Sequence, residues 1–283
     1  MAQLSTIPTR VKGPYALTTE SVSFGYTGAT ILEGINLAVR EGEFLSLLGP
    51  SGSGKTTLLR LLAGIETPSG GRIICNGRIV SGAVMDRSMV FQDYSLFPWM
   101  NLLENILLAI GKAHPGWTKP EQRELAEEYL GMVGLDGLGC KYPFELSGGM
   151  QQRVAIARAL AMGSPFLLMD EPFGALDPIN RNKLQDLLID IWSQASPAKT
   201  VVFVTHDMDE ALYLGDRVII LGSFPGRIMA ELEVNFPRPR SRQSCLTDPE
   251  LQALRREIVD YFRQDVMEQL DGIGAIRSQR EGI

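Results

Sequence analysis

The sequence predicts an α/β protein whose core is interrupted by a block of helices. Residues 43–48 form an apolar strand that runs into a glycine-rich loop and then into an apolar helix at residues 57–63. From residue 101 to about residue 163 the apolar positions recur at helical spacing. Apolar strand segments return later in the chain, at residues 166–169, 200–205 and 217–221. Strands and helices in this order are typical of an α/β core that carries a helical insertion.

The other elements are predicted from the same signals, taken along the chain. Short β-rich segments come first, at residues 16–24, 31–39, 71–76 and 89–92. Asn101 and Glu104 match a capping box, which predicts a helix start at that point. Further helices are expected at residues 121–133, 150–162, 178–194 and 208–214.

The C-terminal segment, residues 248–265, has the pattern of an amphipathic helix. Its apolar residues Leu251, Leu254, Ile258 and Phe262 fall on one face. We expect this face to pack on the core, and binding of a partner is the alternative.

Composition limits the classes of protein that this chain can belong to. The 283 residues suffice for one large α/β domain with an insertion, or for two small domains. The net charge of −6 gives no electrostatic argument for nucleic acid as a partner. No apolar run approaches the roughly 20 residues that span a bilayer. The three cysteines are scattered without metal-site spacing, as expected for ordinary thiols.

These patterns predict a division of the chain into three parts. We expect a flexible lead over residues 1–15, a main domain over residues 16–240 and a tail over residues 241–283. The main domain would consist of a core, residues 16–92 and 164–240, and a helical insertion, about residues 93–163.

The glycine-rich loop has the sequence pattern G-x-x-x-x-G-K-[ST], which makes physical sense around phosphates. Glycines let several backbone N–H groups point into one concavity, and the helix that follows adds the positive end of its dipole. Lys55 would reach the β- and γ-phosphates, and the Thr56 hydroxyl would face Mg²⁺. The alternative to a phosphate-binding loop is an ordinary Gly/Ser surface turn. The predicted nucleotide-binding residues are Gly49, Pro50, Ser51, Gly52, Ser53, Gly54, Lys55, Thr56 and Thr57.

Two carboxylates end the apolar strand at residues 166–169. A strand that emerges beside the phosphate loop can place Asp170 near Mg²⁺ and its waters. Glu171, one residue further on, can polarise a water for attack on the γ-phosphate. Acidic strand ends are common, and the phosphate loop in the same chain makes this pair informative.

The segment Leu146-Ser147-Gly148-Gly149-Met150-Gln151 predicts a second anion site. Its bare amides, the Ser147 hydroxyl and the dipole of the following helix all favour a negative ligand. One nucleotide does not need two such sites from one chain. A head-to-tail dimer explains both, because Ser147 of each copy then closes over the γ-phosphate held by Lys55 of the other. A glycine-rich helix cap is the alternative.

With these motifs in order from residue 17 to residue 221, the chain resembles the ATPase subunit of an ATP-binding cassette (ABC) transporter. The resemblance implies a P-loop NTPase core (RecA-like) with an antiparallel β subdomain and an inserted α-helical subdomain. It also implies hydrolysis of ATP with Mg²⁺, in a dimer of two copies. Ser147, Gly148, Gly149 and Gln151 match the family's signature segment, which acts in trans.

The resemblance also implies roles for single residues. Tyr26 matches the aromatic residue that stacks on adenine, although a tyrosine in a strand can also be a core residue. Gln92 matches the glutamine that touches Mg²⁺ and the attacking water, and Asp170 would reach the metal through water. Asp177 matches the loop that communicates across the dimer. His206 matches the histidine that contacts the γ-phosphate, which makes it catalytic together with Glu171, Lys55 and Gln92.

Two segments resemble importers of nitrate, sulfonates and taurine in particular. These are residues 92–99 and the residues from Pro225 to Arg240. The expected partners are transmembrane permease subunits and an extracytoplasmic solute-binding protein. The expected location is peripheral, at the cytoplasmic face of the inner membrane. Trp99 would line the groove that receives a permease helix, or it would be packed inside the helical block.

Four rival functions remain open at this point. A soluble cassette ATPase of DNA repair or translation usually has a long coiled-coil insertion or two cassettes per chain, and neither is present here. A P-loop kinase has no use for residues 146–149. A protein that only binds ATP would not need Glu171 and His206. An exporter subunit remains possible, although exporters often fuse the membrane span to the cassette.

Overall fold

The computed structural model describes residues 14–26, 28–174, 176–194 and 198–280. The predicted lead over residues 1–15 therefore lies almost entirely outside the described residues.

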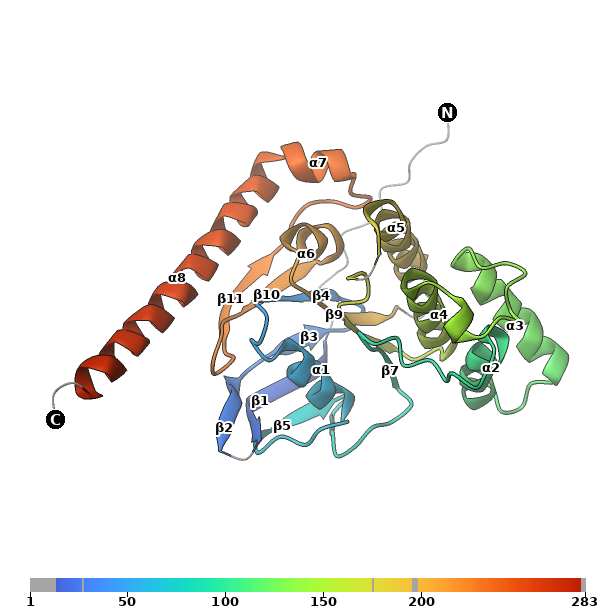
Figure 1. The fold of residues 1–283 in the computed structure, drawn as a ribbon, viewed down its shortest axis with the longest axis horizontal. Helices are drawn as coiled ribbons and strands as arrows, with labels where there is room; N and C mark the ends of the chain where they lie inside the picture. The colour runs from blue at the N-terminus through green and yellow to red at the C-terminus, as the bar shows by residue number, and fades with distance from the viewer. Residues whose placement is uncertain (1–13, 27, 175, 195–197, 281–283) are drawn as a thin grey trace.

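The larger of two sheets has six strands in the order β11-β10-β4-β9-β8-β7 (Figure 1). All neighbours in it are parallel except β10 and β11. Its strands are β4 (Phe44–Leu48), β7 (Arg87–Val90), β8 (Phe166–Asp170), β9 (Thr200–Thr205), β10 (Arg217–Leu221) and β11 (Ile228–Glu233).

The smaller sheet is antiparallel and is built around β1. Its strands are β1 (Tyr15–Tyr26), β2 (Ala29–Ile35), β3 (Ala38–Arg40), β5 (Gly70–Cys75) and β6 (Arg78–Ile79). The β-rich segment expected at residues 31–39 is divided into two strands, because β2 and β3 pair with different parts of β1. The buried Thr19 hydroxyl donates to the Ile35 carbonyl and accepts from the Leu37 amide, both at 2.8 Å. These side-chain bonds take the place of ladder bonds and divide the strand.

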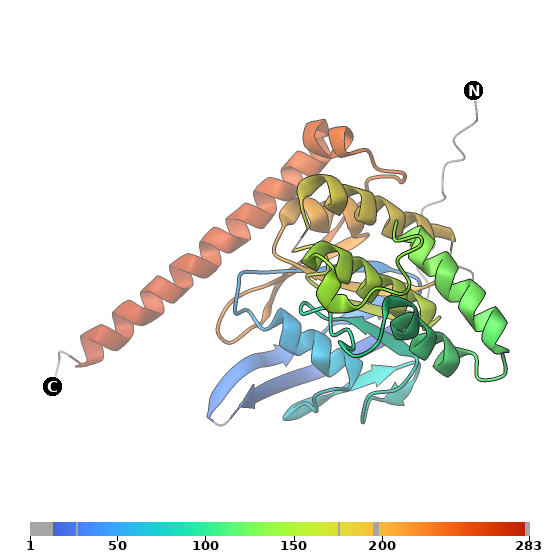
Figure 2. The same ribbon diagram turned by 45° about the vertical axis from the view of Figure 1, so that its right-hand side comes forward.

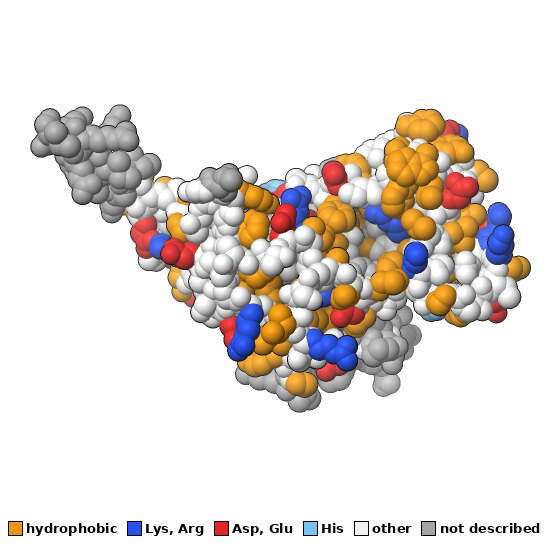
Figure 3. All heavy atoms as spheres, turned by 90° about the horizontal axis from the view of Figure 1, so that it is seen from below, with side chains coloured by type: hydrophobic (Ala, Val, Ile, Leu, Met, Phe, Trp, Pro, Cys, Tyr) orange, Lys and Arg blue, Asp and Glu red, His pale blue; other side chains and the backbone are white. Residues whose placement is uncertain are grey.

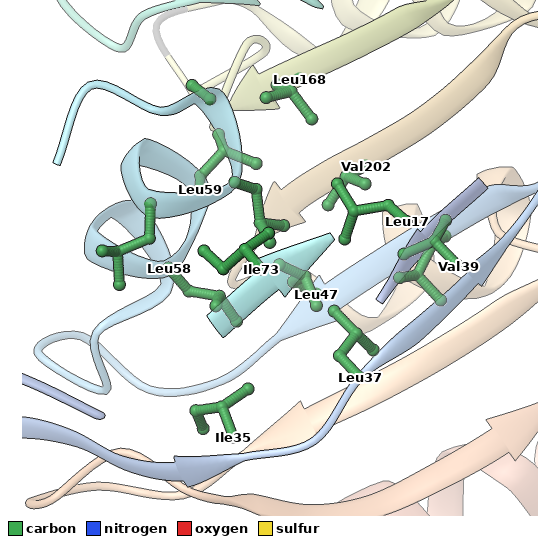
Figure 4. Close-up of a cluster of buried hydrophobic side chains, with 14 of the residues drawn as sticks. Leu17, Ile35, Leu37, Val39, Leu47, Leu58, Leu59, Ile73, Leu168 and Val202 are labelled. Carbon is green, nitrogen blue, oxygen red and sulfur yellow. The ribbon is translucent and has the colours of Figure 1, made fainter. Parts of the chain in front are cut away.

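Helix α1 (Lys55–Ala63) packs into the main core, which both sheets share. Buried leucines of α1 meet Leu17 and Val39 of the small sheet and Leu47 and Val202 of the large one (Figure 4). Burial of such side chains is the dominant stabilising term of the fold. It also holds the start of α1 at the edge of the large sheet where β4 ends.

The helical block lies between β7 and β8 in the chain, to one side of the large sheet (Figure 1). The capping box is confirmed, because Asn101 and Glu104 exchange two 2.8 Å hydrogen bonds at the start of α2. Helix α4 begins at Gly148, earlier than the predicted residue 150, since Ser147 is its N-cap. The elements of the block are α2 (Leu102–Ala113), α3 (Lys119–Met132), the 3₁₀ turn η1 (Pro143–Glu145) and α4 (Gly148–Ala161).

The last four helices are α5 (Pro178–Gln194), α6 (Met208–Leu214), α7 (Arg242–Thr247) and α8 (Pro249–Arg280). The packing face predicted for the tail is confirmed. Leu251 and Ile258 are buried, and Leu254 and Phe262 pack against the same cluster. Helix α8 runs beyond the predicted end at residue 265, and Figures 1 and 2 show it extending away from the body. None of the helices in the described part of the chain is both long and apolar enough to cross a membrane.

A buried ion pair ties the two sheets together, and it carries a prediction. Arg217 of β10 is 1 % exposed and donates to Glu43 at 2.7 Å and to the Ala38 carbonyl of β3 at 2.6 Å. Burial raises the pKa of Glu43, and Arg217 opposes that rise. Arg217→Ala leaves the buried Glu43 carboxyl with only the more distant Arg40, at 3.8 Å, so we expect a loss of about 3–5 kcal/mol in the free energy of unfolding. Urea denaturation measures it, and a loss below about 1 kcal/mol would contradict this role.

Candidate functional site

Four neighbouring parallel strands end at one edge of the large sheet, and each is followed by a predicted site segment. Strand β4 leads into the phosphate loop, and β9, beside it, leads to His206. Strand β8 ends at Asp170 and is followed by Glu171, and β7 is followed by Gln92. Ligands of open α/β sheets bind at this carboxyl edge of the strands. Segments more than 150 residues apart in the sequence, such as the phosphate loop and His206, are thereby brought to one site.

The phosphate loop holds its lysine in a buried position. Lys55 is 5 % exposed, and its Nζ donates to the carbonyls of Gly49 at 2.9 Å and Pro50 at 2.8 Å. Burial lowers the pKa of Lys55, and the charges of Glu171 and Asp170 oppose that shift. Helix α1 starts after Gly54, at φ 85°, without a side-chain cap. Its first amides are therefore available to an anion, as a phosphate site requires.

Thr56 and Asp170 form a pair of oxygen groups beside the loop. The Thr56 hydroxyl donates to Oδ1 of Asp170 at 3.0 Å. Burial raises the pKa of Asp170, and the hydrogen bond from Thr56 opposes that rise. Hydroxyl and carboxylate oxygens are what Mg²⁺ prefers, and this cation usually keeps several waters. The two groups therefore fit a magnesium ion that would also touch phosphate.

Glu171 and His206 lie together at the carboxyl edge. His206 Nδ1 is 3.1 Å from Oε2 of Glu171, and the Glu171 amide donates to the Val204 carbonyl at 3.1 Å. Glu171 has a φ of 44°, in the left-handed region that a glutamate rarely adopts. Backbone strain of this kind concentrates at functional sites. The His206 side chain is 63 % exposed and so is open to a ligand.

The segment that contains Gln92 contacts helix α4, which begins with the signature segment. The sequence did not predict these contacts. Gln92 itself is exposed. Two residues later, Tyr94 packs on Gly148, where an added Cβ would lie 2.9 Å from the tyrosine hydroxyl. Arg158 of α4 donates to the carbonyls of Ser95 at 2.8 Å and Tyr94 at 3.4 Å. These contacts join the segment after Gln92 to the start and the later turns of α4.

The signature segment keeps its glycines for steric reasons as well. An added Cβ at Gly149 would lie 2.9 Å from Leu176, beside Asp177. The Ser147 hydroxyl accepts from the Met150 amide at 3.4 Å, and Gln151 donates to the Leu146 carbonyl at 3.3 Å. The segment thus forms the start of α4 in the helical block.

Asp177 caps the start of α5, and its neighbour Ala175 lies outside the described residues. The Asp177 Oδ1 atom accepts from the amides of Ile179 and Asn180, both at 3.1 Å. These hydrogen bonds lower the pKa of Asp177, and those from Asn180 have the largest effect. Its side chain is exposed and so can face a partner chain.

Two predicted aromatic residues are exposed, which excludes the alternative placement of each. Tyr26 is 49 % exposed, so it is not a core residue of the strand. Its hydroxyl donates to Glu66 at 3.3 Å. Trp99 is 69 % exposed, so the prediction that it packs inside the helical block is wrong.

Hydrophobic side chains gather over the right-hand part of the surface in Figure 3. Exposed Trp99, Tyr142 and Phe144 belong to the same helical block.

Comparisons with known proteins agree with one another. A family model described as "ABC transporter" matches residues 32–174. The nitrate import ATP-binding protein NrtD of Synechococcus elongatus is 45 % identical over 82 % of this chain and 84 % of its own. The bicarbonate transport ATP-binding protein CmpD of Synechocystis is 42 % identical over 90 % of this chain and 92 % of its own. A solved dimeric ATP-binding cassette bound to ADP and Pi aligns with TM-score 0.70 and 34 % identity, over 78 % of this chain and 99 % of its own.

Proposed function

Because the chain belongs to the ABC transporter family and is an ATPase of the cassette type, we propose that it drives the import of a small oxyanion. Nitrate is the first candidate solute, with bicarbonate, sulfonates and taurine as the others. The observation that carries the catalytic part is the meeting of Lys55, the Thr56–Asp170 pair and the Glu171–His206 pair at one sheet edge. We assign the ATPase to residues 16–240 and treat residues 241–283 as a tail.

Each residue of the site has one task in this proposal. Lys55 and the amides of the phosphate loop bind the phosphates, and Tyr26 stacks on the adenine. Thr56, Gln92 and, through water, Asp170 would hold a Mg²⁺ that neutralises phosphate charge. Glu171 accepts the proton of the attacking water, and His206 contacts the γ-phosphate. The reaction needs little more than positioning and charge neutralisation.

Two copies of the chain complete the site in this proposal. Ser147, Gly148, Gly149 and Gln151 of one copy close over the γ-phosphate bound to the other, and Asp177 lies between the two sites. ATP then favours the closed dimer because its γ-phosphate contacts both copies. Hydrolysis removes this link between the copies and favours opening. The dimeric cassette with 34 % identity to this chain supports the arrangement.

The exposed aromatic residues of the helical block support a partner in the membrane. Exposed apolar side chains that gather on one surface mark interaction sites. We assign the surface near Gln92 and Trp99 to a transmembrane permease, which places the ATPase at the cytoplasmic face of the inner membrane. An extracytoplasmic solute-binding protein would deliver the solute. Nothing in the charge of the chain favours nucleic acid as a partner.

The solute is tested by growth of a strain that lacks the gene. We expect no growth with nitrate as the only nitrogen source and normal growth with ammonium. Parallel cultures use low inorganic carbon, and taurine as the only sulfur source with sulfate as control. A defect restricted to carbon or sulfur would move the assignment to bicarbonate or to sulfonates. Normal growth in all cultures would overturn oxyanion import, whereas the ATPase assignment would stand.

A further inference from the structure

The loop between β10 and β11, residues 222–227, lies between α8 and the phosphate loop. We call it the 222–227 loop. It leaves the end of β10, next to β4 in the large sheet, and returns as β11. One side contacts α8 through a buried carboxylate. The other side contacts the backbone of the phosphate loop.

Asp265 of α8 anchors the 222–227 loop. Its side chain is 3 % exposed, and its two oxygens accept from the Ser223 amide at 3.1 Å each. The Ser223 hydroxyl donates to Oδ2 at 2.7 Å, and Gln269 donates to the same oxygen at 3.0 Å. Arg227 and Glu268 form an ion pair one turn further on. A buried charge with this many donors holds its position well.

The same loop, together with Leu221 at the end of β10, packs against the phosphate loop. An added Cβ at Gly226 would lie 2.2 Å from the Ser53 carbonyl oxygen, and one at Gly49 would lie 2.7 Å from the Leu221 carbonyl oxygen. The ring of Phe224 lies 3.7 Å from the position of a Cβ on Gly52. The backbones of Gly226 and Ser53 leave no room for a Cβ between them, so a displacement of the 222–227 loop would disturb the packing of the phosphate loop.

The loop is also fixed from the third side. The Gly226 amide donates to the Ile31 carbonyl at 2.7 Å, and the Glu33 amide donates to the Gly226 carbonyl at 3.0 Å. Strand β2 thus holds the far end of the loop, and the tail contributes Asp265, which is buried, and Glu268, which is exposed. Asp265 is therefore the buried link from the tail helix to the 222–227 loop.

We propose that Asp265 is a positioning residue for nucleotide binding, which acts through the 222–227 loop on the backbone of residues 49–54. The tail helix α8 thereby sets the affinity of the site for ATP. This inference rests on the proposed function, because it assumes that the nucleotide is bound at Lys55. Removal of the Asp265 charge would let the 222–227 loop relax and would leave the amides of the phosphate loop less well aligned.

The test compares Asp265→Asn with a matched control. The asparagine keeps the size of the side chain but sets its NH₂ group against the donors of Ser223 and Gln269. Asp260→Asn removes the same charge from the same helix, at an exposed residue that pairs with Arg263 on the helix surface. The measurements are the dissociation constant for MgATP by titration calorimetry, the KM and kcat of phosphate release, and thermal unfolding.

We expect Asp265→Asn to raise the dissociation constant and the KM for ATP by about 3- to 30-fold, with kcat at saturating ATP within about twofold. Asp260→Asn should match the wild type. Ser223→Ala removes one bond to Asp265 and should show a smaller effect in the same direction. Its effect should not add fully to that of Asp265→Asn, because the two groups are in contact.

The outcomes separate this inference from the proposed function. If Asp265→Asn lowers the unfolding temperature but leaves the affinity for ATP unchanged, Asp265 only anchors the helix and the inference is overturned. If Asp265→Asn does not fold, an unchanged affinity in Ser223→Ala overturns it instead. If the wild type neither binds nor hydrolyses ATP, the proposed function fails. That result is distinct from a wild type that is active and variants that equal it.

Discussion

Replacement of Glu171 by glutamine is expected to abolish most of the turnover and to leave the binding of ATP intact. Glutamine keeps the shape of the side chain, so the left-handed backbone at φ 44° and the neighbouring His206 are disturbed little. It cannot accept the proton of the attacking water. General-base catalysis contributes about 10²–10⁴-fold, and we expect a loss of that size in kcat.

Phosphate release and nucleotide titration together measure this effect. The matched control is Glu124→Gln, on the exposed face of α3, which should behave as the wild type. Trapping of an ATP-bound dimer, seen by light scattering, is the second expected result, because binding without hydrolysis cannot reopen the interface. A Glu171→Gln chain with unchanged turnover would remove Glu171 from the role of base.

Replacement of Lys55 by alanine is expected to remove nucleotide binding itself. The ammonium is the cation in the phosphate loop, and it is held there by the carbonyls of Gly49 and Pro50. A hydrogen bond to a charged group contributes about 1.5–3 kcal/mol, so the loss of this group should weaken ATP binding by about 10- to 150-fold.

The control for this variant is Lys112→Ala, which removes an exposed lysine from α2. Titration with MgATP should show wild-type affinity for the control and a much weaker signal for Lys55→Ala. Circular dichroism checks that both are folded. Tight binding by a folded Lys55→Ala chain would contradict the role of Lys55. Glu171→Gln and Lys55→Ala together separate binding from chemistry, since of these two only Lys55→Ala should lose affinity for ATP.

The parts of this account that the sequence could predict are those that depend on local pattern. The phosphate loop, the apolar strands and the capping box of Asn101 are encoded within a few residues each, and the structure has the strands and the cap where they were expected. The division of residues 31–39 into two strands was not visible, because it depends on Thr19, which is distant in the sequence.

Contacts between distant segments were likewise out of reach of local pattern. The bonds from Arg158 to the segment after Gln92 join residues more than 60 positions apart. Asp265 offered one signal: it follows Leu251, Leu254, Ile258 and Phe262 at helical spacing. A carboxylate in an apolar register implies a buried partner, but the identity of that partner, Ser223, comes only from the fold.

The sequence predicted the packing face of α8 and did not predict the C-terminal end of the helix. The apolar periodicity correctly marked the face that packs on the core, and it gave no indication of where the helix stops. Helix α8 continues to Arg280, beyond the last apolar position of that face. Exposed Val266, Met267 and Leu270 lie in this part.

The rate of phosphate release at several concentrations of the chain tests the central claim most directly. If each site is completed by Ser147 of a second copy, the rate per chain with saturating MgATP rises with chain concentration and then levels off. Glu171→Gln should release almost no phosphate throughout. A rate per chain that stays constant at concentrations where light scattering shows monomers would contradict the shared site, and no release by the wild type at any concentration would contradict the ATPase itself.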